Sequence, residues 1–189
     1  MTPAKFVRDE RFEAILEAAQ LVIATKGVEA VSMAELAKTT GLSRPAIYQY
    51  FSSKEDVLAE LVINEIADLS NAIDIQMTGI KDPMERIRVW IHYSLAHLAS
   101  SDHRIIRQIS IDSLPEEKRG MLKAMHGHFM TALISPVSQL GITSVTATCH
   151  LIYAAVAESA KRIDEGAVFE QEASALERFA IAGIEKALS

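Results

Sequence analysis

The 189-residue sequence predicts an all-α protein of about nine helices. Apolar residues recur three and four positions apart over most of the chain, which is the spacing of one helix face. Helix-start sequences such as Asp82-Pro83-Met84-Glu85 and single glycines after apolar runs divide the chain into segments of helical length. No stretch alternates apolar and polar residues as a half-buried strand does. We therefore expect a bundle of helices without a sheet.

The first helix is expected over residues 9–26, where an apolar stripe repeats at helical spacing. A second helix begins at Ser32, because the S-x-x-E spacing from Ser32 to Glu35 forms a capping box. Gly41 ends that helix, since glycine readily adopts the left-handed conformation of a helix stop.

Residues 44–51 form the third predicted helix. Ser43 caps it, and Pro45 lies in its first turn, where the missing N–H breaks no intrahelical bond. Ile47 and Phe51 share one side, whereas the other side carries small, polar and aromatic residues. Such a helix after a tight turn suits the major groove of DNA. Helical hairpins of this kind also occur in purely structural bundles, so geometry alone leaves both interpretations open.

Six further helices are expected over residues 52–77, 82–99, 102–111, 113–136, 144–164 and 170–188. Asp102 is the predicted cap of the helix over 102–111. Pro136 should kink or end its helix, because proline removes an interior hydrogen bond. No linker-like run separates two halves, so the domain boundary should lie within or after the helix over 52–77.

Composition limits the function. The net charge is −6, and residues 1–60 hold 7 Lys and Arg against 9 Asp and Glu, so we expect weak non-specific DNA binding. Lys5 and Arg8 of an N-terminal arm (1–8) could join Arg44 and Lys54 on one basic surface. A secretory signal and a membrane-length apolar run are both missing, which predicts a cytoplasmic protein without membrane partners.

Catalytic and metal motifs are not apparent. The sequence has no phosphate-binding glycine loop and no nucleophile elbow, so we expect neither an enzyme nor a cofactor. The single Cys149 is interpreted as a small buried residue. Because no two histidines are four residues apart on one helix, no metal site is expected, and His103 and His126 should be exposed.

The run L-A-x-x-x-G-L-S-R-P-A-I-Y-Q-Y-F-x-S-K-E-D-V-L over residues 36–58 resembles the signature of the TetR (TetR/AcrR) family of transcriptional regulators. The resemblance covers roughly residues 10–60. It implies a helix-turn-helix DNA-binding domain over 1–55, with the motif over about 32–51, and a ligand-binding and dimerisation domain over 56–189. It also implies a ligand-responsive repressor that binds a palindromic operator as a homodimer.

The resemblance assigns DNA contacts by position. The groove-facing positions correspond to Ser43, Arg44, Pro45, Ala46 and Gln49, and the phosphate-contact positions to Ser32, Met33, Tyr48, Tyr50 and Lys54. Tyr50 stands where the family often has histidine, and Met33 where a hydroxyl residue is frequent. Alternatively, Tyr48 and Tyr50 are packing aromatics and Arg44 is a plain surface charge. A helical module of the same fold that binds a small molecule or protein, but not DNA, also stays open.

The last two predicted helices are apolar on more than one side, which suggests a four-helix dimer interface rather than only a single-chain core. The residues expected there are Ile152, Val156, Ala160, Leu176, Phe179, Ala180, Gly183 and Ile184. An apolar or aromatic effector is expected to contact Trp90, Tyr93, His97, Met125, Phe129 and Tyr153. Ordinary core packing explains the same residues equally well.

Overall fold

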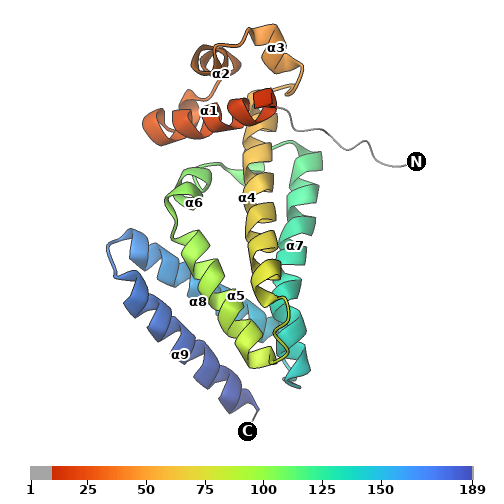
Figure 1. The fold of residues 1–189 in the computed structure, drawn as a ribbon, viewed down its shortest axis with the longest axis vertical. Helices are drawn as coiled ribbons and strands as arrows, with labels where there is room; N and C mark the ends of the chain where they lie inside the picture. The colour runs from red at the N-terminus through yellow and green to blue at the C-terminus, as the bar shows by residue number, and fades with distance from the viewer. Residues whose placement is uncertain (1–9, 189) are drawn as a thin grey trace, which may run out of the picture. The chain divides into compact units, whose positions relative to one another are not determined.

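The computed structural model describes residues 10–188, and within this range it contains nine α-helices, two short 3₁₀-helices and no strand (Figure 1). The all-α prediction is confirmed. The elements are α1 (Glu10–Lys26), η1 (Val28–Ala30), α2 (Met33–Thr40), α3 (Arg44–Tyr48), α4 (Lys54–Met77), α5 (Pro83–Leu98), α6 (Ser101–Ile106), η2 (Ile111–Ser113), α7 (Glu116–Gln139), α8 (Val145–Asp164) and α9 (Phe169–Ala187). Among the described residues, no helix is both long and apolar enough to cross a membrane. The predicted arm over residues 1–8 lies outside the described range.

The chain forms two compact units, which are described separately. The first combines the described part of residues 1–64 with residues 105–122. The second combines residues 65–104 with residues 123–189, of which the last is not described. Three helices, α4, α6 and α7, therefore contribute residues to both units.

The first unit is built on α1. Its apolar stripe is buried, with Ile15 and Ala19 fully inaccessible to solvent. Helix α2 packs on α1, and α3 packs on α2. Phe51, just after α3, stacks on Phe12 of α1 with ring centroids 5.0 Å apart. These contacts fix the orientation of the short α3 within this unit.

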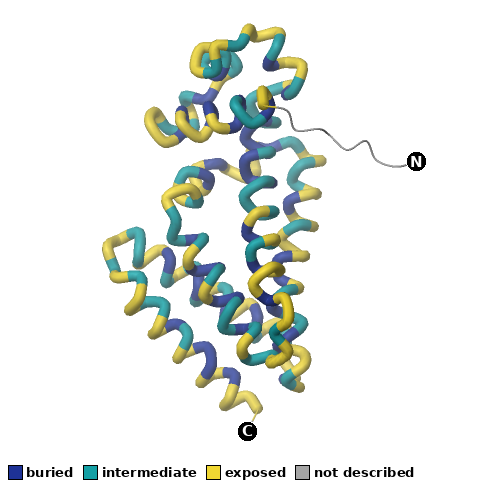
Figure 2. Tube along the Cα trace, in the orientation of Figure 1, coloured by how far each residue is buried: buried dark blue, intermediate teal, exposed yellow. Residues whose placement is uncertain are grey.

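The second unit is centred on α5, α8 and α9, which pack pairwise against one another. Trp90 of α5 is fully buried and lies beside Phe129 of α7. Figure 2 shows α9 with a buried face and an exposed face along its length. Exposed apolar side chains remain on α8 and α9, with Leu151 70% and Phe179 71% exposed, which agrees with the prediction that these helices are apolar on more than one side.

The predicted end of α3 and both predicted ends of α6 are wrong. Helix α3 ends at Tyr48 rather than at residue 51, because the Tyr50 N–H donates to the Ile47 carbonyl in a tighter turn (2.9 Å). Helix α6 is capped by Ser100 rather than by Asp102, since the backbone N–H of His103 donates to Ser100 Oγ (3.1 Å). It ends at Ile106, short of residue 111.

Helix α7 continues through Pro136 to Gln139, so of the two expected outcomes, a kink or an end of the helix, the end is wrong. Proline costs the helix one backbone hydrogen bond. Leu133 and Val137, on either side of Pro136, are fully buried in the core of the second unit. We attribute the continuation to this burial, because packing of an apolar face contributes more to a helix than a single backbone bond does.

Candidate nucleic-acid interface

The entry into α2 is set by Ser32. Its Oγ accepts the backbone N–H of Glu35 (3.1 Å), which confirms this half of the predicted capping box. The Glu35 carboxylate contacts Lys26 Nζ. This hydrogen bond and the charge of Lys26 hold the pKa of Glu35 below its ordinary value. The side chain of Glu35 therefore ties α2 to the end of α1.

The turn between α2 and α3 is held by local hydrogen bonds. Gly41 has a φ of +72°, the left-handed conformation predicted for it. Thr40 Oγ1 donates to the Leu36 carbonyl (2.8 Å) and accepts the N–H of Leu42 (3.3 Å). Ser43 Oγ then accepts the N–H of Ala46 (3.3 Å) and begins α3, as predicted. Gly41 and Ser43 therefore have the roles that the sequence predicted, whereas the hydrogen bonds of Thr40 were not predicted.

Helix α3 has a buried side and an exposed side. Ile47 is fully buried, whereas Tyr48 is 53% exposed. The predicted groove-facing residues Ser43, Arg44, Pro45 and Gln49 are exposed, and Ala46 is half-buried. Among described residues, Arg44 makes no hydrogen bond or ion pair, so its guanidinium group can donate to an external acceptor.

The predicted phosphate-contact residues differ from one another in solvent exposure. Ser32 and Tyr48 are exposed, whereas Met33, Tyr50 and Lys54 are half-buried. The start of α4 is capped by Ser53, whose Oγ accepts the N–H of Asp56 (3.2 Å). The Asp56 carboxylate in turn accepts the N–H of Ser52 (3.1 Å). Part of this helix terminus is therefore satisfied by side chains of the protein itself.

The residues predicted to contact an effector lie in the second unit and include a tight aromatic cluster. The rings of Trp90 and Phe129 are 5.0 Å apart, and Tyr153 lies edge-on to both. Trp90 Nε1–H donates to the Phe129 carbonyl (3.4 Å). Burial and the negative charge of Glu65 raise the pKa of Tyr153. Tyr93 and Met125 are half-buried.

A buried hydroxyl group beside this cluster was missed by sequence analysis. Ser94 of α5 is fully buried, and no described residue pairs with its Oγ. Ser94 follows Trp90 by four residues and precedes His97 by three, so the three side chains share one face of α5. A buried hydroxyl without a partner is destabilising by about 1–3 kcal/mol.

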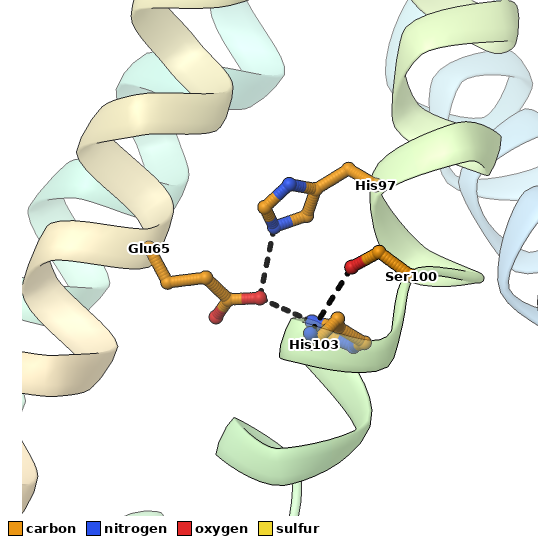
Figure 3. Close-up of polar contacts among 4 residues, drawn as sticks. All are labelled: Glu65, His97, Ser100 and His103. Carbon is orange, nitrogen blue, oxygen red and sulfur yellow. Dashed lines mark hydrogen bonds and ion pairs between the residues drawn. The ribbon is translucent and has the colours of Figure 1, made fainter. Parts of the chain in front are cut away.

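His97, the remaining residue predicted to contact an effector, belongs to a polar cluster with Glu65 and His103 (Figure 3). Glu65 Oε1 of α4 lies 2.8 Å from His97 Nε2 and also contacts His103 Nδ1. Burial alone would raise the pKa of Glu65, but the hydrogen bonds from His103 and His97 outweigh it and lower this pKa to about 2. The expectation of an exposed His103 is wrong, because this contact covers it, whereas His126 is exposed as expected.

The residues predicted for a dimer interface fall into two sets. Six are buried within this chain: Ile152, Val156, Ala160, Leu176, Ala180 and Ile184. Phe179 is 71% exposed, and Gly183 is also exposed. Leu151, which sequence analysis did not single out, is 70% exposed. These last three residues line an apolar groove of about 470 Å³ between α8 and α9, together with Thr148, Ile152, Ala155, Ala180, Ile184 and Ala187.

Comparison with known proteins matches the helix-turn-helix region. Residues 15–61 match the model of a family described as bacterial regulatory proteins, tetR family. Over 81 residues, the chain is 40% identical to the HTH-type transcriptional regulator EthR of Mycolicibacterium smegmatis, covering 42% of this chain and 37% of EthR. The chain spans about half the length, or less, of three curated relatives that it matches (54%, 37% and 46%).

Solved structures resemble the chain over nearly its whole length. The regulator FadR of Bacillus subtilis, solved with stearoyl-CoA, has a TM-score of 0.75 at 20% identity and covers 91% of this chain and 98% of its own. AibR, solved with isovaleryl coenzyme A and operator DNA, has a TM-score of 0.73 at 23% identity, with coverages of 89% and 96%. At these identities the likeness concerns the fold.

Proposed function

Because this chain belongs to the TetR family of bacterial regulatory proteins, we propose that it is a transcriptional regulator that binds a palindromic DNA operator as a homodimer and responds to a small molecule. The observation that carries the proposal is the two-sided α3. Ile47 is buried in the first unit, whereas Arg44 is exposed on the same short helix and Gln49 is exposed at its C-cap. We assign DNA reading to residues 1–55, and sensing and dimerisation to residues 56–189.

Base reading is assigned to α3. The Arg44 guanidinium has the donor geometry to bind O6 and N7 of guanine, and Gln49 can pair with adenine in the major groove. The Tyr48 hydroxyl can donate to a phosphate oxygen without contributing charge. Lys54, at the start of α4, would add a positive charge near backbone N–H groups.

Dimerisation is assigned to the groove between α8 and α9. Leu151 and Phe179 leave most of their apolar surface in water, which is unfavourable in a lone chain. A second copy of the same face would cover both side chains in a two-fold arrangement. Two helices per chain would then form a four-helix bundle.

Sensing is assigned to the region around Trp90, Ser94 and Tyr153. An effector with an apolar body and one polar group would match this region, because its polar group could satisfy the Ser94 hydroxyl. Acyl-CoA thioesters are the first compounds to test, since FadR and AibR were solved with such ligands. Aromatic compounds form the second set.

A module that keeps this fold without binding DNA is the second candidate. The acidic balance of residues 1–60, with 7 basic and 9 acidic side chains, favours it. Selection of bound duplexes from a random pool at near-physiological salt distinguishes the two. A palindromic consensus supports the regulator, and its half-site spacing reports the distance between the two α3 helices. No enrichment by a folded, effector-free dimer would refute DNA reading.

A further inference from the structure

We propose that Glu65, His97 and His103 form a binding site for one divalent transition-metal ion, with Zn²⁺ as the representative ion. Each residue directs one ligand atom toward the others (Figure 3). Glu65 Oε1, His97 Nε2 and His103 Nδ1 all lie within 4.8 Å of one another. Among the described residues, no other group of three His, Cys, Asp or Glu side chains converges in this way.

The distances are close to those of a coordinated ion. With metal–ligand bonds of about 2.0–2.2 Å, two ligands of a tetrahedral zinc ion lie about 3.3 Å apart. Glu65 Oε1 and His97 Nε2 are 2.8 Å apart, so an ion requires them to separate by about half an ångström. The contact between Glu65 Oε1 and His103 Nδ1 has to lengthen as well when an ion binds between these atoms.

The ligand atoms also have suitable chemistry. Imidazole nitrogen and carboxylate oxygen are the donors that zinc and neighbouring transition metals use, whereas calcium and magnesium prefer oxygen alone. Three protein ligands leave one tetrahedral position for water or for an anionic group of a small molecule. Binding would displace the ring protons that face Glu65, because a ligating nitrogen must be unprotonated.

The backbone holds the three side chains in place. Glu65 lies within α4, His97 in the last turn of α5 and His103 in α6, and all three belong to the second unit. The cap formed by Ser100 Oγ on the backbone N–H of His103 fixes the first turn of α6 and hence the position of this imidazole. The side chains of Glu65, His97 and His103 are only 12%, 23% and 21% exposed, so competition from water is limited.

The alternative is a purely structural hydrogen-bonded cluster, in which two imidazole groups donate to one carboxylate and no ion binds. Two substitutions separate the alternatives. In His97→Gln, the side-chain amide can replace the Nε2–H donor, and in His103→Asn it can replace the Nδ1–H donor. Both variants can keep the hydrogen bond to Glu65 and the fold, but they lose the imidazole nitrogen that binds a metal ion.

The experiment is calorimetric titration of tag-free, chelator-treated protein with Zn²⁺. We expect one ion per chain, and a dissociation constant at least about 10-fold weaker in His97→Gln and in His103→Asn, because even groups behind the ligands contribute 10–100-fold. Co²⁺ in place of Zn²⁺ should produce visible absorption bands of a tetrahedral site, which excess Zn²⁺ removes. The matched control is His128→Gln, since His128 Nε2 lies 3.8 Å from Asp74 Oδ2 and no described residue completes a group of three ligands there.

Two further measurements show whether a loss of binding comes from the metal site or from misfolding. Circular dichroism checks that each variant has the helical content of the parent protein, and the cobalt spectrum of the parent tests the site without any substitution. The proposal is supported if binding weakens at least about 10-fold in His97→Gln and in His103→Asn and is unchanged in His128→Gln. It is overturned if the parent protein shows no saturable binding, or if both ligand variants bind as tightly as the parent.

Discussion

Replacing Phe179 by aspartate should convert the protein from a dimer to a monomer. A phenylalanine side chain buries roughly 200 Å², so its 71% exposed fraction leaves about 140 Å² for a partner to cover. At about 25 cal/mol/Å², covering it contributes about 3.5 kcal/mol per chain. A two-fold interface contains the residue twice, so the upper bound is about 7 kcal/mol. We expect the dimer dissociation constant to rise at least about 1,000-fold.

Sedimentation velocity over a range of protein concentrations measures this constant directly. Ile75→Asp is the matched control, because Ile75 is 68% exposed on α4 and does not line the groove. It should leave the dimer intact, although it introduces the same charge on a similarly exposed apolar residue. Leu151→Asp, on the opposite wall of the groove, should reproduce the effect of Phe179→Asp.

A Phe179→Asp variant that has the helical content of the parent and dimerises with the same dissociation constant would contradict this prediction. In that case, the groove between α8 and α9 would not be the dimer interface. If Ile75→Asp dissociated equally, the effect would come from added charge and not from this groove. A parent protein that stays monomeric at micromolar concentration would refute the dimer directly.

Three further predictions concern single side chains. Arg44→Ala should lower the affinity for the operator by about 1–3 kcal/mol and relax the preference at one base position. Lys54→Ala should weaken binding to all DNA sequences alike and reduce the slope of log binding constant against log salt concentration by about 1. Quantitative electrophoretic titrations at several salt concentrations separate these outcomes. Ser94→Ala should raise the free energy of unfolding by about 1 kcal/mol in urea titrations, because it removes a buried hydroxyl without a partner among the described residues. A lower free energy of unfolding would show that the hydroxyl makes a hydrogen bond. Burial raises the pKa of the Cys149 thiol to about 11, so the native protein should not react with a thiol reagent at pH 8 until guanidinium unfolds it, and fast native reaction would contradict the buried position.

Local signals predicted the helix-turn-helix region well. Ser32 and Ser43 cap the helices that the sequence assigned to them, and Gly41 has the left-handed backbone expected of it. These features depend on residues within one turn of each other, so their geometry follows from short-range sterics and hydrogen bonding. The burial of Ile47 opposite the exposed Arg44 follows in the same way from helical periodicity.

Contacts between distant segments could not be predicted in this way. His103 pairs with Glu65, which lies 38 residues earlier in the chain, and no spacing rule connects them. The histidine spacings predicted no metal site, and His103 was expected to be exposed, because spacing rules compare residues on one helix, whereas Glu65, His97 and His103 lie on three. Likewise, Pro136 does not end its helix, since the buried neighbours that hold α7 together come from the packed core.

The sequence by itself determined which segments are helical, where most of them begin and end, and which side of α3 faces solvent, because each depends on neighbours within a few positions. Only the tertiary structure decided that Glu65, His97 and His103 converge. It also decided that Ser94 is buried without a partner among the described residues. On α9, it decided that Phe179 is exposed whereas Leu176 and Ala180 are buried. The physical reason is that helix periodicity defines an apolar face, whereas what covers that face depends on how separate helices pack.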